Sequence, residues 1–490
     1  MADGHEVELK LELDPKDAGD LRCHPLLAGA AASTRAQSSV YFDTKKRALR
    51  KAGYSLRVRR LDDCFIQTVK QAGSGGAGLF NRPEWERSIP SECPDPQALA
   101  ATPAAAIVGP DRIGKLVPVV ESRVDRTIWR IDHQDSEVEL VLDQGIIRGG
   151  GEERALNEVE IELKRGVPGA LLDVARRLAE SVPLRLGVLS KAERGFALAD
   201  GSFDKVSKAA PVAIGAEMDV AEGFAAIVHA CLRHFRLNER LVAERRQPEA
   251  LHQARVAMRR LRSSFSLFRP AIRHSADFER LRGELRWFTA TLGDARNLDV
   301  FLAGNRDEAS DADREALRAA RERAYDRAIE ALESQRFRDL MLELVVWTEG
   351  GDWRRHRKAR APLAKFAEKR LDRLWRKVRD GGRDLRGLGE EQRHRLRIHI
   401  KKLRYAVEFL AELYRPAALA QKRFAGALEG MQESLGHLND IATARTLVER
   451  LGLSSALAER PAAGPDEEGH HLADAESRFA GLTRIGPFWR

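Results

Sequence analysis

The sequence predicts an α+β protein in which a mainly antiparallel β-domain is followed by an all-α domain. Residues 1–200 contain short segments in which charged and apolar side chains alternate, as they do in half-buried β-strands. From Glu217 onward, apolar residues recur with the helical period of about 3.6 residues. The stretch 201–216 between them is small, polar and interrupted by proline, which is typical of a linker. We therefore expect three parts, 1–200, 201–216 and 217–490.

Length and charge agree with this division. At 490 residues the chain is too long for one ordinary hydrophobic core. Residues 1–200 carry 29 Lys and Arg against 31 Asp and Glu, whereas the remainder carries 54 against 43. The net charge of +9 therefore comes from the helical part, and a basic domain of this kind suits a polyanionic partner.

Several classes of protein are disfavoured. No run of about 18 apolar residues is present, so we expect no membrane span. The first residues lack the basic and then apolar profile of a secretion signal. The four cysteines lie far apart, with no spacing typical of a metal site. These features favour a cytoplasmic protein.

The β-domain is predicted from alternation and from β-branched and aromatic content. Glycines separate the segments, and a helix is expected at about 170–181, before Pro183. The sheet is large enough to curl into a barrel. The expected strands are 5–10, 40–44, 54–60, 65–70, 84–87, 126–131, 137–143 and 158–164.

The first of these strands carries the most informative pattern. Because a strand rises roughly 3.4 Å per residue, Glu6 and Glu8 would lie about 7 Å apart on one face, together with Lys10. Both carboxylates could then reach one divalent cation. The segment 158–164 repeats this alternation, with Glu158, Glu160 and Glu162 on one face. An amphipathic strand with its charges in water would show the same pattern.

Other strands also gather charge on one face. Arg57 and Arg59 share a face, as do Glu139 and Asp143. If these faces turn inward, the barrel becomes a tunnel lined with both acids and bases. Burying each charged group in such a lining costs on the order of several kcal/mol, unless the charges are paired with one another or neutralised by bound ions. A bound triphosphate with its metal would offset that cost.

These segments together resemble the CYTH family of triphosphate tunnel enzymes over residues 3–200. Glu-x-Glu-x-Lys alone is a weak signal, whereas the ordered set is specific. The resemblance rests on Glu6-x-Glu8-x-Lys10, Tyr41-Phe42-Asp43-Thr44, Leu56-Arg57-Val58-Arg59, Lys70, Leu142-Asp143-Gln144-Gly145, Glu158 to Lys164 and Ser190-Lys191-Ala192-Glu193-Arg194-Gly195.

The resemblance implies a closed eight-stranded barrel in which bases grip a triphosphate and acids hold Mg²⁺ or Mn²⁺. Hard oxygen ligands suit these ions, and arginine makes bidentate contacts with phosphate. The implied metal ligands are Glu6, Glu8, Asp143, Glu158, Glu160 and Glu162. The implied catalytic phosphate clamp is Lys10, Arg57, Arg59, Lys70, Arg126 and Lys191. Arg123 and Arg130 compete with Arg126 for its place, and Arg82 and Arg87 could also reach the tunnel.

The helical part contains an internal repeat. His252-x-x-Arg255-Val256-x-x-Arg259-Arg260-Leu261-Arg262 matches His394-x-x-Arg397-Ile398-x-x-Lys401-Lys402-Leu403-Arg404 without a gap. Leu292-Gly293 matches Leu435-Gly436 at nearly the same offset. In each copy the histidine and bases form a stripe beside an apolar stripe. We therefore expect two copies of a helical bundle, although a solvated basic face would look similar.

This part resembles the CHAD family over about 217–490. The resemblance implies two pseudo-symmetric four-helix bundles, roughly 217–345 and 355–490, that bind inorganic polyphosphate. No aromatic stacking platform accompanies the stripes, which disfavours nucleic acid. The implied polyphosphate-binding residues are His252, Arg255, Arg259, Arg260, Arg262, His394, Arg397, Lys401, Lys402 and Arg404.

The expected function is therefore hydrolysis of inorganic triphosphate to diphosphate and phosphate by a metal-dependent enzyme with a polyphosphate-binding helical module. Water would attack the terminal phosphoanhydride, since phosphoryl transfer chiefly demands positioning and electrostatics. Association with polyphosphate granules in the cytoplasm would follow. The alternatives are an adenylyl cyclase or thiamine triphosphatase in the same tunnel, or a non-catalytic polyphosphate-binding scaffold.

Overall fold

The computed structural model describes residues 4–305, 309–454, 457 and 465–490. It divides into two compact units. The first comprises residues 1–206 with 338–349, and the second comprises 207–337 with 350–490. None of the helices in the described part of the chain combines the length and the apolar run that crossing a bilayer requires.

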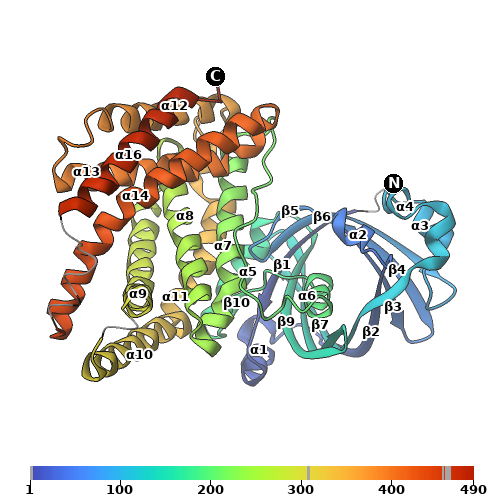
Figure 1. Cartoon of the computed structure of the whole chain (residues 1–490). Coiled ribbons are helices and arrows are strands. Elements are labelled where there is room, and N and C mark those ends of the chain that lie inside the picture. Colours follow the sequence, from blue (N-terminus) through green and yellow to red (C-terminus); the bar gives the residue numbers. More distant parts are fainter. Residues whose placement is uncertain (1–3, 306–308, 455–456, 458–464) are drawn as a thin grey trace. The chain divides into compact units, whose positions relative to one another are not determined.

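The first unit is a closed barrel of eight antiparallel strands, as predicted (Figure 1). Around the ring the order is β1, β9, β8, β7, β2, β3, β4 and β6, and β6 pairs again with β1. Short strands β5 (Ser74–Gly75) and β10 (Arg185–Leu186) extend β6 and β1. The barrel strands are β1 Gly4–Glu12, β2 Ser33–Asp43, β3 Tyr54–Leu61, β4 Cys64–Gln71, β6 Leu79–Ile89, β7 Val117–His133, β8 Ser136–Gly149 and β9 Glu152–Arg165.

Helices cover the apolar outer faces of the strands. The helix predicted at 170–181 is α5 (Gly169–Ala179), which packs on β1, β8 and β9. Outward side chains of β2, β3, β4 and β6, such as Leu56 and Val69, share a core with Leu99 and Val108 of α3 and α4. The remaining short helices are η1 Pro15–Asp17, α1 Ala18–Arg22, η2 Pro25–Leu27, α2 Ala48–Lys51, α3 Pro96–Ala100, α4 Ala104–Val108, η3 Pro110–Lys115 and α6 Lys191–Ala199.

Burial of the apolar outer faces of the strands determines which side chains face the barrel interior. Side chains alternate along a strand, so burying Leu9, Leu11, Val159 and Ile161 beneath the outer layer turns the alternate positions inward. These alternate positions hold the glutamates and Lys10. The interior is therefore charged because the hydrophobic burial is on the outside.

The second unit is helical. Helices α7 to α10 pack in succession, and so do α12, α13, α14 and α16, while α8 and α13 pack against each other (Figure 1). This agrees with two copies of a four-helix unit. The helices are α7 Val220–Arg245, α8 Pro248–Ile272, α9 Phe278–Gly304, α10 Asp311–Glu333, α11 Gln335–Gly350, η4 Asp352–Arg355, α12 Leu363–Gly381, α13 Glu390–Phe409, η5 Ala411–Ala417, α14 Ala418–Leu451 and α16 Pro465–Ile485.

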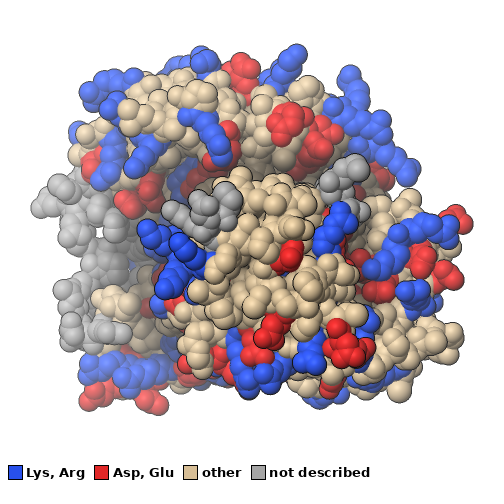
Figure 2. All heavy atoms as spheres, turned by 90° about the vertical axis from the view of Figure 1, so that its right-hand side faces the viewer, with Lys and Arg blue, Asp and Glu red and all other residues tan. Residues whose placement is uncertain are grey.

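Surface charge is mixed on the face that Figure 2 shows. Basic and acidic side chains are interspersed there, with uncharged surface between them. No single sign of charge dominates this face.

Candidate active site

Strand register places the predicted charges on one continuous inner surface. Directly opposed residues in an antiparallel pair project from the same face of the sheet. Lys10 opposes Glu160, and Asp143 opposes Glu158 on one side and Arg126 on the other. The same rule continues through Tyr41–Arg57, Arg57–Thr68, Lys70–Glu84 and Arg82–Glu6.

The inner surface encloses a cavity of about 440 Å³. Ten of the twelve predicted barrel residues line it, whereas Asp143 and Glu158 are not among its lining residues. These two carboxylates are buried, with 0% and 2% of their surface exposed. The lining comprises Glu6, Glu8, Lys10, Arg35, Tyr41, Ser55, Arg57, Arg59, Thr68, Lys70, Arg82, Glu84, Glu86, Arg126, Glu139, Glu160, Glu162, Lys164, Ser190, Lys191 and Ala192.

Three carboxylates form a compact cluster. Asp143, Glu158 and Glu160 each offer an oxygen, and these atoms all lie within 4.8 Å of one another. Lys191 Nζ contacts all three, at 2.7 Å from Asp143 and 2.9 Å from Glu160. Arg126 forms a fork on Asp143, with Nε at 2.8 Å and Nη2 at 2.6 Å, and also reaches Glu160. This donor set, carboxylate oxygens only, fits Mg²⁺ or Mn²⁺.

The members of this cluster differ in acidity. Burial opposes ionisation of Asp143 and Glu160, but neighbouring cations outweigh burial and lower both pKa values. For Glu158, burial and the charges of Glu160 and Asp143 outweigh Lys191 and Lys10, and the pKa is raised. Glu158 is therefore the most basic carboxylate of the three.

Glu6 and Glu8 occupy a neighbouring position. Lys70 Nζ contacts both Glu6 oxygens, at 2.6 and 2.7 Å. Arg82 donates Nε to Glu6 at 3.0 Å and Nη2 to Glu8 at 2.5 Å. Lys10 Nζ lies 3.1 Å from Glu8 and also contacts Glu160. Lys10 thus joins the Glu6–Glu8 pair to the three-carboxylate cluster.

We expect Glu6 to make the fold sensitive to acid. Burial raises its pKa, but Lys70 and Arg82 outweigh burial, and its pKa falls from 4.5 to about 2. The unfolded chain takes up this proton at higher pH than the folded chain. Stability from Glu6 is therefore complete above about pH 4.5 and is lost as the pH falls towards about 2. Unfolding free energies should depend less steeply on pH across this window in Glu6→Gln than in the unmodified chain, and equal slopes would contradict the assignment.

Arg57 and Arg59 lie on one face of β3 but differ in compensation. Burial lowers the pKa of Arg57, yet Tyr41 and Glu84 outweigh burial and raise it. Burial, then Arg57 and Arg126, lower the pKa of Arg59 to about 10. Arg59 Nη2 lies 3.9 Å from a carboxylate oxygen of Glu86, and Arg57 donates to Thr68 at 3.3 Å. Within the described part of the chain, the Nε atoms of both arginines lack a hydrogen-bond partner. The cavity therefore contains both an acid cluster and a pair of arginines.

Glu162 opposes Glu8 across the β1–β9 pair but is not part of the three-carboxylate cluster. Its closest ion-pair partner is Lys164, at 2.8 Å, and Lys164 also reaches Glu139 at 3.5 Å. Burial raises the Glu162 pKa despite Lys164. The structure therefore brings Glu162 to the cavity without bringing it into the three-carboxylate cluster.

Helix α6 packs against the inner surface of the barrel. A capping box between Ser190 and Glu193 begins the helix and fixes Lys191 at its first position. Ala192 and Phe196 pack against the inward side chain of Val120. A Cβ on Gly195 would lie 2.0 Å from Val120 Cγ1, so only glycine allows this approach. The helix thereby fills part of the barrel interior and delivers Lys191 to the acids.

The structure distinguishes Arg126 from Arg123 and Arg130, the alternatives for its place. Arg126 is inward, whereas the side chains of Arg123 and Arg130 are 60% and 76% exposed. Arg82 points into the cavity and was a lesser candidate on sequence alone. The alternation of Arg82, Glu84 and Glu86 could have shown it, had β6 been recognised as starting at Leu79.

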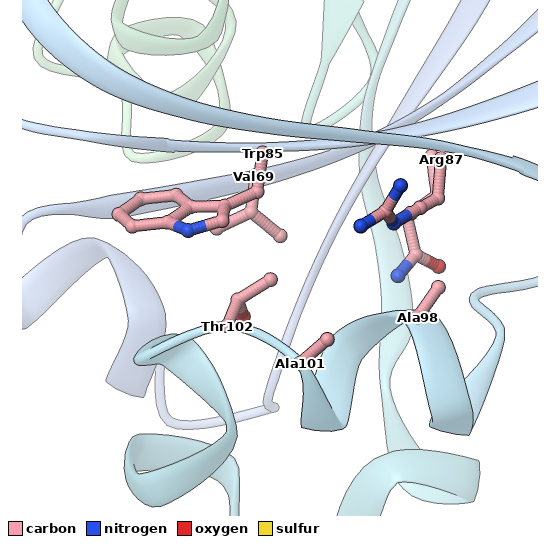
Figure 3. A pocket seen from close by; sticks show the side chains of 7 residues that line it. Val69, Trp85, Arg87, Ala98, Ala101 and Thr102 are labelled. Carbon is pink, nitrogen blue, oxygen red and sulfur yellow. The ribbon is translucent and has the colours of Figure 1, made fainter. Parts of the chain in front are cut away.

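Arg87 lies on the other face of β6. It lines a hollow of about 20 Å³ between strands β4 and β6 and the segment 98–102 (Figure 3). Trp85, Ala98 and Thr102 also line this hollow. Its volume suits a single water molecule. Arg87 is therefore separated from the cavity by the wall of the barrel.

The second unit carries the predicted basic stripes on α8 and α13. Burial, then Arg259 and Arg296, lower the pKa of Arg255 to about 10. Burial, then Lys377, Arg282 and Arg262, lower that of Lys402. Arg262, a base of the first copy, is therefore close enough to lower the pKa of Lys402 in the second copy. Arg282, Arg296 and Lys377 were not predicted, because they lie on α9 and α12, outside the repeated motif.

Arg260 and Arg404 share one acidic partner. Arg260 and Arg404 both contact Glu408, at 2.5 and 2.6 Å. Arg260 is only 6% exposed and packs on the ring of Phe409. His252, Arg255, Arg259, Arg397, Lys401 and Lys402 are half-buried, and Arg262 and His394 are exposed. Of these two pairs, Arg260–Glu408 links α8 to α13, whereas Arg404–Glu408 lies within α13.

Known proteins match the two units separately. The family model for the CYTH domain matches residues 4–196, and that for the CHAD domain matches residues 226–449. The inorganic triphosphatase of Haemophilus influenzae is 29% identical over 204 residues, which cover 40% of this chain and 56% of that protein. The chain thus spans little more than half the length of this relative.

Two solved structures are also similar. The CHAD domain of the plant Ricinus communis is 30% identical, with a TM-score of 0.47, covering 56% of this chain and 96% of that one. The Hippeastrum protein HpAC1, described as having a dominant triphosphatase activity, is 20% identical, with a TM-score of 0.32, covering 40% and 95%.

Proposed function

Because the chain carries a CYTH domain at residues 4–196 followed by a CHAD domain at residues 226–449, we propose that its barrel is a metal-dependent inorganic triphosphatase. The observation that carries this proposal is the division of one inner surface into an acid cluster and an arginine pair. Asp143, Glu158 and Glu160 suit a divalent cation, and Arg57 and Arg59 suit phosphate. The name of the Haemophilus influenzae relative supports the same activity.

The residues divide the work between binding and proton transfer. Arg57 and Arg59 would hold the phosphate chain, with Lys10, Lys70, Arg126 and Lys191 neutralising charge as the terminal phosphoryl group transfers. The acid cluster, with Glu6 and Glu8, would hold Mg²⁺ or Mn²⁺, which polarises phosphoryl oxygens. A carboxylate that lines the cavity, Glu6, Glu8 or Glu160, would orient the attacking water and accept its proton.

The lining favours an inorganic substrate over a nucleotide or thiamine compound. Among the described residues that line the cavity, Tyr41 is the only aromatic side chain and Ala192 the only aliphatic one. Organic groups bind in pockets lined mainly by apolar and aromatic side chains. A chain of phosphates needs only charge and hydrogen-bond donors.

A substrate panel tests this choice. Purified full-length chain is incubated with inorganic triphosphate, ATP or thiamine triphosphate, with Mg²⁺ or Mn²⁺, and phosphate and cyclic nucleotide are measured. We expect phosphate release to be fastest from inorganic triphosphate, with no cyclic nucleotide. Cyclic AMP from ATP would favour a cyclase, faster cleavage of thiamine triphosphate would favour a thiamine triphosphatase, and binding without turnover would favour a scaffold.

We further propose that the helical unit binds inorganic polyphosphate, which could supply or localise the enzyme. Arg262 is close enough to contribute to the lowered pKa values of both Arg255 and Lys402, which supports one site that spans both copies. Such a site holds positive charges close together, which a linear polyanion would neutralise. Arg260 and Arg404 would stabilise the site through Glu408 rather than bind the ligand.

A glycine in α9 gives a specific test of this site. The Cβ of an alanine at position 293 would lie 2.6 Å from Arg255 Nη1, so Gly293→Ala must displace that guanidinium. Gly283→Ala, in the same helix, meets no heavy atom of the described residues within 4 Å. We expect Gly293→Ala to weaken polyphosphate binding severalfold without loss of thermal stability, because alanine favours a helix by about 1 kcal/mol. Equal polyphosphate affinities in the two variants would show that Arg255 is not a ligand.

A further inference from the structure

Arg82 is the cavity-lining base that bridges Glu6 and Glu8. We propose that Arg82 gates the metal site. Its guanidinium pairs with Glu6 and Glu8 until a phosphate chain binds it, and only then are the two carboxylates available to a cation. The inference rests on the proposed function for the identity of the anion. It adds a coupling between the cation and the anion that the catalytic residues alone do not require.

Ion pairs and a ring contact fix the position of the Arg82 side chain. One guanidinium spans two carboxylates, with Nε 3.0 Å from Glu6 Oε2 and Nη2 2.5 Å from Glu8 Oε1. The guanidinium carbon lies 5.2 Å from the centroid of the Phe80 ring, within reach of a cation–π contact. The side chain is only 11% exposed. Water therefore screens these ion pairs weakly.

The local charge is already balanced without a metal. Glu6 is shared between Lys70 and Arg82, and Glu8 between Arg82 and Lys10. A divalent cation that used either carboxylate would compete with the guanidinium for the same oxygens and would be repelled by it. Free cation should therefore bind weakly while Arg82 remains in place.

A phosphate chain offers Arg82 another partner. Arg57, Arg59 and Arg82 line the same cavity, and guanidinium groups bind phosphate oxygens in the same forked geometry as carboxylates. A triphosphate would thus draw Arg82 from Glu6 and Glu8 and free these ligands for the cation. Anion and cation should accordingly raise each other's affinity, since coupling between two sites is reciprocal.

The experiment measures Mn²⁺ binding to the full-length chain without triphosphate, by the electron paramagnetic resonance signal of free Mn²⁺. The variant is Arg82→Gln. The matched control is Arg87→Gln, which removes the same charge from the opposite face of the same strand (Figure 3). We expect Arg82→Gln to bind Mn²⁺ about tenfold more tightly than the unmodified chain, and Arg87→Gln to match the unmodified chain.

A second measurement uses imidotriphosphate, a triphosphate analogue with nitrogen bridges, saturated with Mn²⁺ and followed by calorimetry. Arg82→Gln should bind this complex more weakly than the unmodified chain, because it lacks one phosphate ligand. If Arg82→Gln fails to fold, Arg82→Lys replaces it. Lysine keeps the charge but cannot form the fork on two carboxylates, so it too should bind free Mn²⁺ more tightly.

Unchanged or weaker binding of free Mn²⁺ by a folded Arg82 variant would overturn the gate. This outcome is separate from failure of the proposed function. Tighter Mn²⁺ binding by the variant in a chain that hydrolyses no triphosphate would retain the gate and refute the triphosphatase. Triphosphate turnover by the unmodified chain, with no change in Mn²⁺ affinity when Arg82 is replaced, would retain the triphosphatase and refute the gate.

Discussion

Replacing Glu160 with glutamine is expected to reduce kcat/KM for triphosphate by about a thousandfold. Glu160 belongs to the three-carboxylate cluster and also contacts Lys10, Arg126 and Lys191. Its removal would take a ligand from the cation and leave three buried cations with less compensation. The barrel should also lose about 3 kcal/mol of stability, since breaking a buried ion pair is costly.

Glu153→Gln is the matched control for this variant. Glu153 lies on the same strand, β9, but is exposed and pairs with Arg148 outside the cavity. Initial rates of phosphate release and thermal unfolding of both variants separate loss of chemistry from loss of fold. A folded Glu160→Gln variant with nearly full activity would remove the acid cluster from the mechanism.

The second large effect is expected in the helical unit. The triple variant Arg255→Ala, Arg259→Ala and Arg262→Ala should weaken binding of long-chain polyphosphate by about a hundredfold. This corresponds to three charge-assisted contacts of roughly 1 kcal/mol each. The slope of log affinity against log salt concentration should also decrease by about three, because fewer counterions are released.

A charge-matched control is available on α10. Arg318, Arg323 and Arg327 are exposed there, and replacing all three with alanine removes the same net charge. Fluorescence anisotropy with labelled polyphosphate at several salt concentrations compares the two triple variants. Equal losses of affinity would mean that only net charge matters and that the α8 stripe is not a site.

Strand alternation explains how much of the barrel could be predicted. Glu6, Glu8 and Lys10 share a face in any extended strand, and this local parity survives in the folded barrel. Whether the shared face points inward depends on what covers the opposite face. Here α5 and the α3–α4 segment supply that cover, and periodicity within a strand carries no information about such distant packing.

The details that escaped prediction are those set by pairing between distant segments. Asp143 and Glu158 belong to the acid cluster but lie behind Lys191, and only the register of β8 and β9 with α6 decides that depth. Likewise, Arg260 matches the stripe by spacing, yet Glu408 on α13 engages it from the other copy. A sequence repeat shows which positions correspond, but not which of them find partners across the bundle.

The most direct test of the proposed activity is phosphate release from inorganic triphosphate by the purified full-length chain, measured against Mg²⁺ or Mn²⁺ concentration with a chelator arm. We predict turnover that rises with either cation, saturates and disappears with excess chelator. Turnover that persists in chelator, or none at any cation concentration, would contradict a metal-dependent triphosphatase in this barrel.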